Sequence, residues 1–177
     1  YVSASIPDKL KFQGNVSGGQ FGNRFGKFKT GVSNKNYGIM FQTVLDGSDG
    51  FKTIKGGGNT GFTKNDYLFK ARVNSANELA AAELKVSQTN EISNETYLGL
   101  TREDFEADPY IRYRASHKDK MTANHAHISL TGAIKLFTNS DLTTTLYQNN
   151  FHRNWYKLNK IAGQSISSIL AEGNNGE

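Results

Sequence analysis

The sequence contains no cysteine, and only two of its 177 residues are proline. Without cysteine, the chain has no disulfide framework, no thiolate metal site and no cysteine nucleophile. Its longest apolar runs span only a few residues, as in Gly38-Ile39-Met40-Phe41, whereas a membrane helix needs about 20 consecutive apolar residues. The sequence therefore predicts no transmembrane helix.

A signal peptide is also missing, because Tyr1 is followed by neither a charged start nor an apolar run. We therefore expect the chain to be mature, trimmed or a fragment. The net charge of +5 permits an anionic partner without choosing among nucleic acid, anionic lipid and an acidic ligand. What is abundant is glycine (18), phenylalanine (11) and tyrosine (8), a composition that predicts a β-rich protein with many turns.

Alternation of apolar and polar residues with period two is the main structural signal. It predicts seven strands, over residues 9–18, 24–33, 37–45, 66–74, 80–87, 122–136 and 142–150. Seven basic residues of these strands fall opposite the apolar side; they are Lys11, Lys27, Lys29, Lys70, Arg72, Lys85 and Lys135. Each strand is thus expected to have one apolar and one polar face.

Short and long connections alternate between these strands. Residues 34–36, 75–79 and 137–141 are short and turn-like, whereas residues 46–65, 91–121 and those from Phe151 onward form longer segments. The connection at residues 19–23 is short, although the alternation of short and long connections would place a long loop there. Tight turns at one edge and long loops at the other are typical of an outer-membrane β-barrel, and strands of roughly 9–15 residues suffice for tilted crossings.

A soluble β-sandwich or water-soluble barrel is the alternative, because its strands alternate in the same way. Strands of soluble proteins are typically about 5–6 residues, which favours the membrane barrel. Seven is an odd number of strands, and bacterial single-chain barrels have even numbers and no open edges in lipid. We therefore expect these strands to be part of a larger barrel.

Three motifs suggest chemistry, and each has a simpler explanation. The glycine-rich segment 55–61 lacks the ending of a phosphate-binding loop, so we interpret it as a loop tip. His125 and His127 lie two apart on the polar face without a third metal ligand, and we interpret them as solvated. Residues 101–109 predict a short helix with Thr101 as N-cap, and the acidic residues there fit helix-start chemistry better than an acid/base pair.

Arginine and aromatic residues gather after this helix. Arg112, Tyr113 and Arg114, with Arg102 nearby, predict a surface that holds an anion through guanidinium hydrogen bonds. A solvated loop with internal salt bridges to the acidic helix explains the same residues, and the residues alone favour it slightly over an anion site. Residues 151–156 follow the predicted seventh strand, and their Trp and Tyr suit the interface girdle of a barrel.

Several of these segments resemble one family. The string Ser-Asn-Glu-Thr-Tyr-Leu-Gly-Leu-Thr at residues 93–101, with Asp104-Phe105 and Asp108-Pro109-Tyr110, resembles the third-loop region of TonB-dependent outer-membrane receptors of the ferric dicitrate type. Residues 49–52, 56–58 and 60–62 look like the second loop of that group. Residues 142–145, 150–151 and 153–158 look like its seventh strand and following loop. The resemblance covers about residues 9–160.

The resemblance implies an all-β fold, an antiparallel meander of about seven strands from a 22-stranded transmembrane barrel in the bacterial outer membrane. Residues 1–177 would be the N-terminal part of the barrel domain, and neither the plug nor the TonB box is recognisable. The implied function is TonB-dependent uptake of a ferric chelate, ferric citrate above others, with TonB reached through the plug. It implies no catalysis, no cofactor, no metal ligand in the protein and no nucleic-acid partner.

The ligand contacts implied by the family placement and by charge are Arg112 and Arg114 first, then Arg102 and Arg153, all expected on external loops. A function of another class stays open: the chain could be a passive porin-like segment or a purely structural segment of a barrel, without a specific ligand. A soluble carbohydrate- or nucleic-acid-binding β-domain is a third reading, and it requires the apolar face to be buried against a second sheet.

Overall fold

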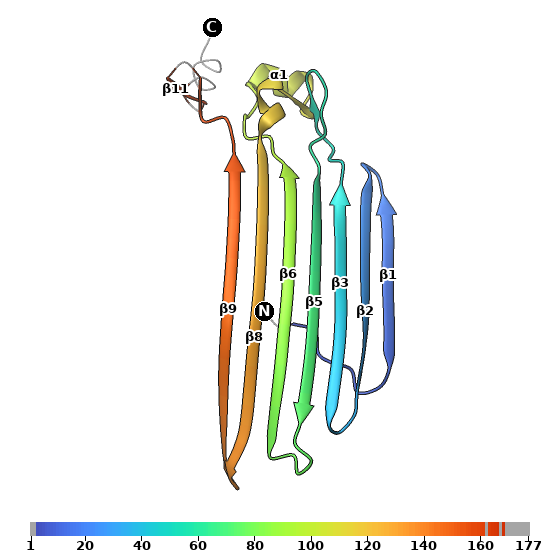
Figure 1. Cartoon of the computed structure of the whole chain (residues 1–177). Helices are drawn as coiled ribbons and strands as arrows, with labels where there is room; N and C mark the ends of the chain where they lie inside the picture. Colours follow the sequence, from blue (N-terminus) through green and yellow to red (C-terminus); the bar gives the residue numbers. More distant parts are fainter. Residues whose placement is uncertain (1–2, 162, 167, 169–177) are drawn as a thin grey trace.

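Seven antiparallel strands lie side by side in chain order and form one sheet (Figure 1). The computed structural model describes residues 3–161, 163–166 and 168. The strands of the sheet are β1 (Lys11–Gly19), β2 (Asn23–Ser33), β3 (Tyr37–Ser48), β5 (Phe62–Asn74), β6 (Ala80–Asn94), β8 (Lys120–Phe137) and β9 (Ser140–Tyr156). The sheet is not closed, and β1 and β9 are its two edges. The predicted seven-stranded meander is thus confirmed, whereas the larger barrel stays a prediction.

The strand ends differ from those predicted, mostly because the strands are longer. The sixth strand begins at Lys120 instead of residue 122, and the fifth continues to Asn94 instead of residue 87. The seventh strand runs to Tyr156, so the prediction of a loop from Phe151 onward is wrong. Hydrogen-bonded pairing continues past the point where apolar alternation stops, and the apolar pattern alone does not mark that end.

Connections of different length separate the two ends of the sheet. Residues 34–36, 75–79 and 138–139 make short turns at one end. At the other end lie residues 20–22, the second loop (residues 49–61) and the third loop (residues 95–119). The predicted alternation is confirmed. Within the part of the chain that the structure describes, no helix is long and apolar enough to cross a membrane.

The register gives the sheet one apolar and one polar face. One row on the apolar face joins Phe41, Phe69, Val86 and Ile128 across four strands. Large apolar side chains of this face stay exposed, for example Leu130 at 49%. The basic residues predicted to lie opposite the apolar side share the other face. No buried apolar residue in the described ranges lies on the apolar face, so nothing described covers it.

The upper border of the apolar face is slanted relative to the hydrogen-bonded rows. Toward the long-loop end, the main apolar run of this face ends at Leu45 on β3 and at Leu146 on β9, and only Ile92 on β6 and Tyr156 on β9 are large apolar side chains beyond it on these strands. The row that contains Leu45 reaches β9 at His152, six residues beyond Leu146. Six residues at about 3.3 Å each span about 20 Å along the strand, and four strand spacings of about 4.8 Å span about 19 Å across the sheet. The border is therefore inclined by about 45° to the hydrogen-bonded rows. Strands of transmembrane barrels tilt by about 35–45°.

The N-terminal segment crosses the polar face. Ser33 donates a hydrogen bond from its hydroxyl to the carbonyl oxygen of Pro7 at 2.8 Å. A Cβ at Gly31 would lie 2.8 Å from the Pro7 ring, so the close approach requires glycine there. Met40, on the same face, is only 1% exposed. The polar face is therefore partly covered by the chain's own N-terminal segment, whereas the apolar face is open.

Candidate functional site

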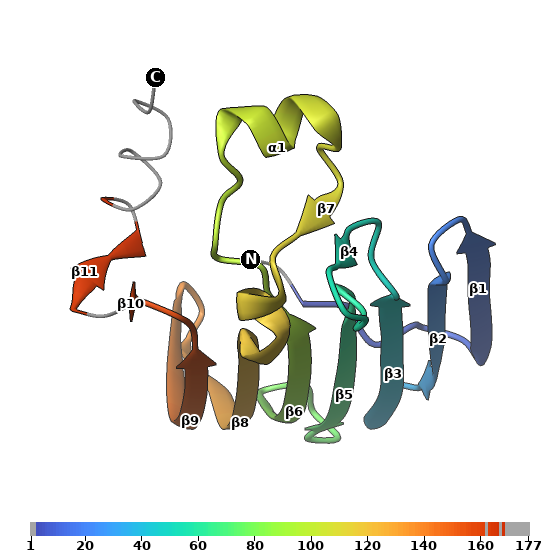
Figure 2. The same ribbon diagram turned by 90° about the horizontal axis from the view of Figure 1, so that it is seen from above.

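The second and third loops form one unit above the sheet. The second loop contains β4 (Thr53–Ile54), and the third contains α1 (Arg102–Ala107), β7 (Ile111–Arg112) and the 3-10 helix η1 (Arg114–Lys118). β4 and β7 pair in parallel, with hydrogen bonds from Thr53 N–H to the Tyr110 carbonyl (3.0 Å) and from Lys55 N–H to the Arg112 carbonyl (2.8 Å). In Figure 2, α1 and β7 lie on the same side of the sheet as the N-terminal segment, which is the polar side.

A capped helix start holds the third loop in shape. Thr101 is the N-cap, as predicted, and its hydroxyl oxygen accepts a hydrogen bond from Asp104 N–H at 3.2 Å. The Asp104 carboxylate accepts hydrogen bonds from the hydroxyls of Tyr113 and Thr101, and Lys55 of the second loop lies 3.9 Å away. The Tyr113 hydrogen bond, above other causes, lowers the pKa of Asp104 below its ordinary value. These acidic groups therefore serve the cap, as predicted.

Asp119 fastens the base of the third loop. Its carboxylate is 3% exposed and accepts hydrogen bonds from the backbone N–H groups of Tyr97 (3.1 Å) and Leu158 (3.0 Å). The Tyr97 ring packs edge-on against Trp155, with ring centroids 4.9 Å apart, and Lys157 lies over both rings. The third loop is thus tied both to β9 and to the segment that follows it.

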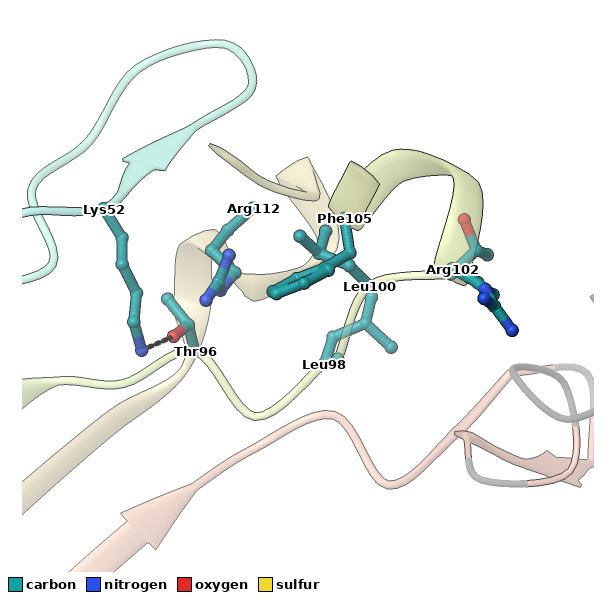
Figure 3. A pocket seen from close by; sticks show the side chains of 9 residues that line it. Lys52, Thr96, Leu98, Leu100, Arg102, Phe105 and Arg112 are labelled. Atoms are coloured by element: carbon teal, nitrogen blue, oxygen red, sulfur yellow. Dashed lines mark hydrogen bonds between the residues drawn. The ribbon is translucent and has the colours of Figure 1, made fainter. Parts of the chain in front are cut away.

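A pocket of about 310 Å³ opens between the two loops (Figure 3). The residues that line it are Lys52, Thr96, Leu98, Gly99, Leu100, Thr101, Arg102, Phe105 and Arg112. The two loops together contain six basic and seven acidic residues, so the loops as a whole are not basic. The pocket lining has three basic residues and no acidic one. Positive charge is therefore concentrated in the pocket and not spread over the loops.

Neighbouring groups position the cations of this pocket. Lys52 donates a hydrogen bond from Nζ to the Thr96 hydroxyl at 3.0 Å, and Arg112 donates to the carbonyl oxygen of Pro109 at 2.8 Å. Figure 3 shows Lys52 beside Thr96 at one end, Arg112 next to Phe105 in the middle, and Arg102 at the other end. Arg102 forms an ion pair with Glu106 at 3.0 Å.

This arrangement suits an anion with several carboxylate groups. Ammonium and guanidinium groups donate charge-assisted hydrogen bonds to carboxylates, and arginine does so with two parallel donors. The side chains of Leu98, Leu100 and Phe105 add apolar surface to the lining; Leu98 is buried, whereas Phe105 is 57% exposed. Among the described residues, no group of three His, Cys, Asp or Glu side chains could hold a metal ion.

The structure brings together only two of the four predicted ligand contacts. Arg112 and Arg102 line the pocket. Arg114, at the start of η1, is exposed, lies beside Gly56 of the second loop and does not line the pocket. Lys52 lines the pocket but was not singled out from the sequence, because no local spacing indicates that the second loop pairs with the third.

Arg153 does not lie on a loop, and that prediction is wrong. It belongs to β9, pairs with Ala123 and lies over the Trp155 ring, 5.3 Å from its centroid. Trp155 shares the polar face with Arg153 and packs on Tyr97, so a place in a lipid-facing girdle is also wrong for Trp155. Both errors follow from ending the seventh strand too early.

The remaining motifs behave as the simpler explanations predict. The glycine-rich segment is a turn at the tip of the second loop, with positive φ at Gly56, Gly57 and Gly58. His125 and His127 lie on the polar face, where both rings contact the side-chain oxygen of Asn149 at 3.3 and 2.7 Å. Comparisons of the chain with models of protein families, with curated proteins and with solved structures find no match.

Proposed function

We propose that these seven strands are part of the wall of a bacterial outer-membrane barrel that takes up a ferric chelate. In this proposal the barrel is a TonB-dependent receptor of the ferric dicitrate type, and energy from TonB reaches it through a plug domain. The long loops face outward and bind the ligand, for which ferric citrate is the first candidate. The role is binding and transport, without catalysis by this chain.

The slanted, exposed apolar face supports a place in lipid. Its border crosses the strands at about 45°, close to the tilt of strands in transmembrane barrels. A soluble sandwich needs a second sheet over this face, and the described residues supply none. Lipid removes the face from water without a second sheet, and further strands would pair with the edges of β1 and β9.

The single observation that carries the ligand assignment is the pocket between the second and third loops. It lies at the long-loop end and is lined by Lys52, Arg102 and Arg112 and by no acidic residue, while Glu106 pairs with Arg102 beside it. Ferric citrate complexes are anionic and bring their own metal donors, so the protein needs only cations that face the ligand. A passive anion-selective pore also gathers Lys and Arg, so saturable binding of one chelate, and not charge alone, separates a receptor from a porin.

The test is a titration of the full-length protein in detergent with ferric citrate, iron-free citrate and an unrelated ferric siderophore. Trp155 serves as a fluorescent reporter, because it packs on Tyr97 at the base of the third loop. We expect saturable binding of ferric citrate only. Arg112→Ala and Lys52→Ala should each weaken it about 10-fold or more, as each removes a charge-assisted hydrogen bond.

Lys35→Ala is the matched control, since Lys35 lies in a short turn at the opposite end of the sheet and pairs only with Glu78 at the surface. It should bind ferric citrate as the unchanged protein does. An equal response to all three ligands, or none to ferric citrate, would exclude this receptor type and favour the porin-like or structural alternative. Equal effects of Lys35→Ala and Arg112→Ala would remove the pocket from the proposal.

A further inference from the structure

The turn between β1 and β2 holds a bulky side chain in a backbone conformation that favours glycine. Residues 20–23 form a β-turn, closed by a hydrogen bond from Asn23 N–H to the Gln20 carbonyl oxygen at 3.2 Å. The two central residues of this turn, Phe21 and Gly22, have φ values of 61° and 63°. Positive φ at both central positions is the requirement of a type I′ turn, which prefers Asn-Gly, Asp-Gly or Gly-Gly. Phenylalanine is therefore a poor choice for the turn itself.

Contacts with the end of β3 and the start of the second loop fix Phe21 in this conformation. Its carbonyl oxygen accepts hydrogen bonds from Asp49 N–H at 2.8 Å and from the Ser48 hydroxyl at 3.1 Å. Asp49 also forms an ion pair with Arg24 of β2 at 3.1 Å. The surrounding structure thus holds an unfavourable backbone conformation in place. Residues in such conformations cluster at active sites and ligand clamps.

The Phe21 ring begins a chain of three aromatic rings that crosses three connections. It lies edge-on to Phe51 of the second loop, with ring centroids 6.3 Å apart. Phe51 in turn lies edge-on to Tyr110 of the third loop, with ring centroids 6.0 Å apart. All three residues are more than half exposed. Burial alone therefore does not explain why phenylalanine, and not asparagine or glycine, occupies the turn.

Phe51 connects this chain to both loops that line the pocket. The Lys52 ammonium group lies over the Phe51 ring, 5.7 Å from its centroid. On its other side the ring contacts Tyr110, whose carbonyl oxygen accepts the Thr53 N–H and which directly precedes β7 with Arg112. The Phe51 ring thus lies between the segments that carry two of the pocket cations.

We infer that Phe21 is a positioning residue for the anion: it acts through Phe51 and sets the separation of Lys52 and Arg112. The spacing of an ammonium and a guanidinium group decides which arrangement of carboxylate groups both can bind at once. The strained turn is retained because its ring fixes the Phe51 ring from the outer side. This inference rests on the proposed function, because it concerns the ligand of the same pocket.

The experiment compares Phe21→Asn with the unchanged full-length protein in detergent. Asparagine suits the turn better, so the midpoint of urea unfolding should stay the same or rise. The Kd for ferric citrate should increase about 2–10-fold, the range expected for the loss of one aromatic contact. Phe21→Tyr keeps the ring and should bind ferric citrate as the unchanged protein does. Weaker binding without a loss of stability is a result that a merely structural role of Phe21 does not give.

Glu78→Asn is the matched control. Among the described residues, Glu78 is the other non-glycine residue with positive φ (58°), and it lies in a short turn at the opposite end of the sheet. This variant should leave the Kd for ferric citrate unchanged. An unchanged Kd for Phe21→Asn, or a weaker binding that comes with a lower unfolding midpoint or is shared by Phe21→Tyr, overturns the inference while the receptor stands. No binding of ferric citrate by the unchanged protein overturns the proposed function instead, so the two failures are distinguishable.

Discussion

A positive charge placed on the apolar face gives the most direct test of its environment. Leu130 lies near the middle of the apolar run of β8, and Thr131 follows it on the polar face. We therefore compare Leu130→Arg with Thr131→Arg. The two variants carry the same new side chain on the same strand, and they differ only in the face that receives it.

The expected magnitude follows from the structure and the lipid. An arginine on the lipid face of a barrel costs about 2–4 kcal/mol at the bilayer midplane. On the polar face the guanidinium stays in water, and a surface substitution there changes stability by about 0.5 kcal/mol or less. In water, Leu130 is already 49% exposed, so an arginine there would cost little. Lipid and water thus predict different results for one variant.

The assay is urea unfolding of the full-length protein in phospholipid vesicles, followed by Trp155 fluorescence. We expect Leu130→Arg to lose about 2–4 kcal/mol of unfolding free energy, and Thr131→Arg to stay close to the unchanged protein. Equal losses for the two variants would refute the reasoning. An apolar face in contact with water or with another protein surface would then have to replace lipid.

Three further outcomes follow from the loops. Asp119→Ala leaves the N–H groups of Tyr97 and Leu158 without their acceptor, which costs about 1–3 kcal/mol for each group. Hydrogen exchange should therefore accelerate at residues 95–119 but not in β3. Unchanged exchange at residues 95–119 would show that Asp119 does not fasten the third loop. The folded pKa of Asp104 is lowered, so its stabilisation of α1 is present above about pH 3.8 and is lost as the pH falls through the folded pKa. Exchange of α1 amides across this range should show the loss, and Tyr113→Phe should reduce it. A Cβ at Gly61 would lie 1.8 Å from the Ser48 carbonyl oxygen. In urea unfolding, Gly61→Ala should therefore lower the free energy of unfolding by at least about 1–3 kcal/mol. Gly132→Ala is the control and should not lower it, because a Cβ at Gly132 would meet open space.

The faces of the sheet follow from the sequence because period-two alternation is a local property. Lys70 and Phe69 are neighbours in the chain, and a strand must place them on opposite sides. The short turns are local as well: Asn34 accepts hydrogen bonds from the N–H groups of Asn36 and Tyr37, the pattern expected of a turn asparagine. The capped helix at Thr101 was predictable for the same reason.

The pocket was not predictable, because it depends on contacts between distant segments. Lys52 and Arg112 are brought together by a parallel pairing of only two residues from each loop. Such a short ladder has no periodic signal, and β4 is too short to alternate. The ion pair between Arg102 and Glu106 is a local feature, because the two residues are four apart on α1. The position of Arg102 relative to Lys52 and Arg112 depends on how the two loops fold and is not local.

The strand ends and the apolar border together explain why the second and third loops meet. On β3 the strand ends three residues beyond Leu45, whereas on β6 it continues eight residues beyond Val86. If the border marks the surface of the hydrocarbon layer, as we propose, the third loop leaves the wall about 19 Å above that surface and the second only about 7 Å above it. The second loop must therefore rise to reach the third, which its pairing through β4 and β7 accomplishes. The cationic pocket between them then stands well clear of the headgroup layer, where a soluble anion reaches it without crossing lipid.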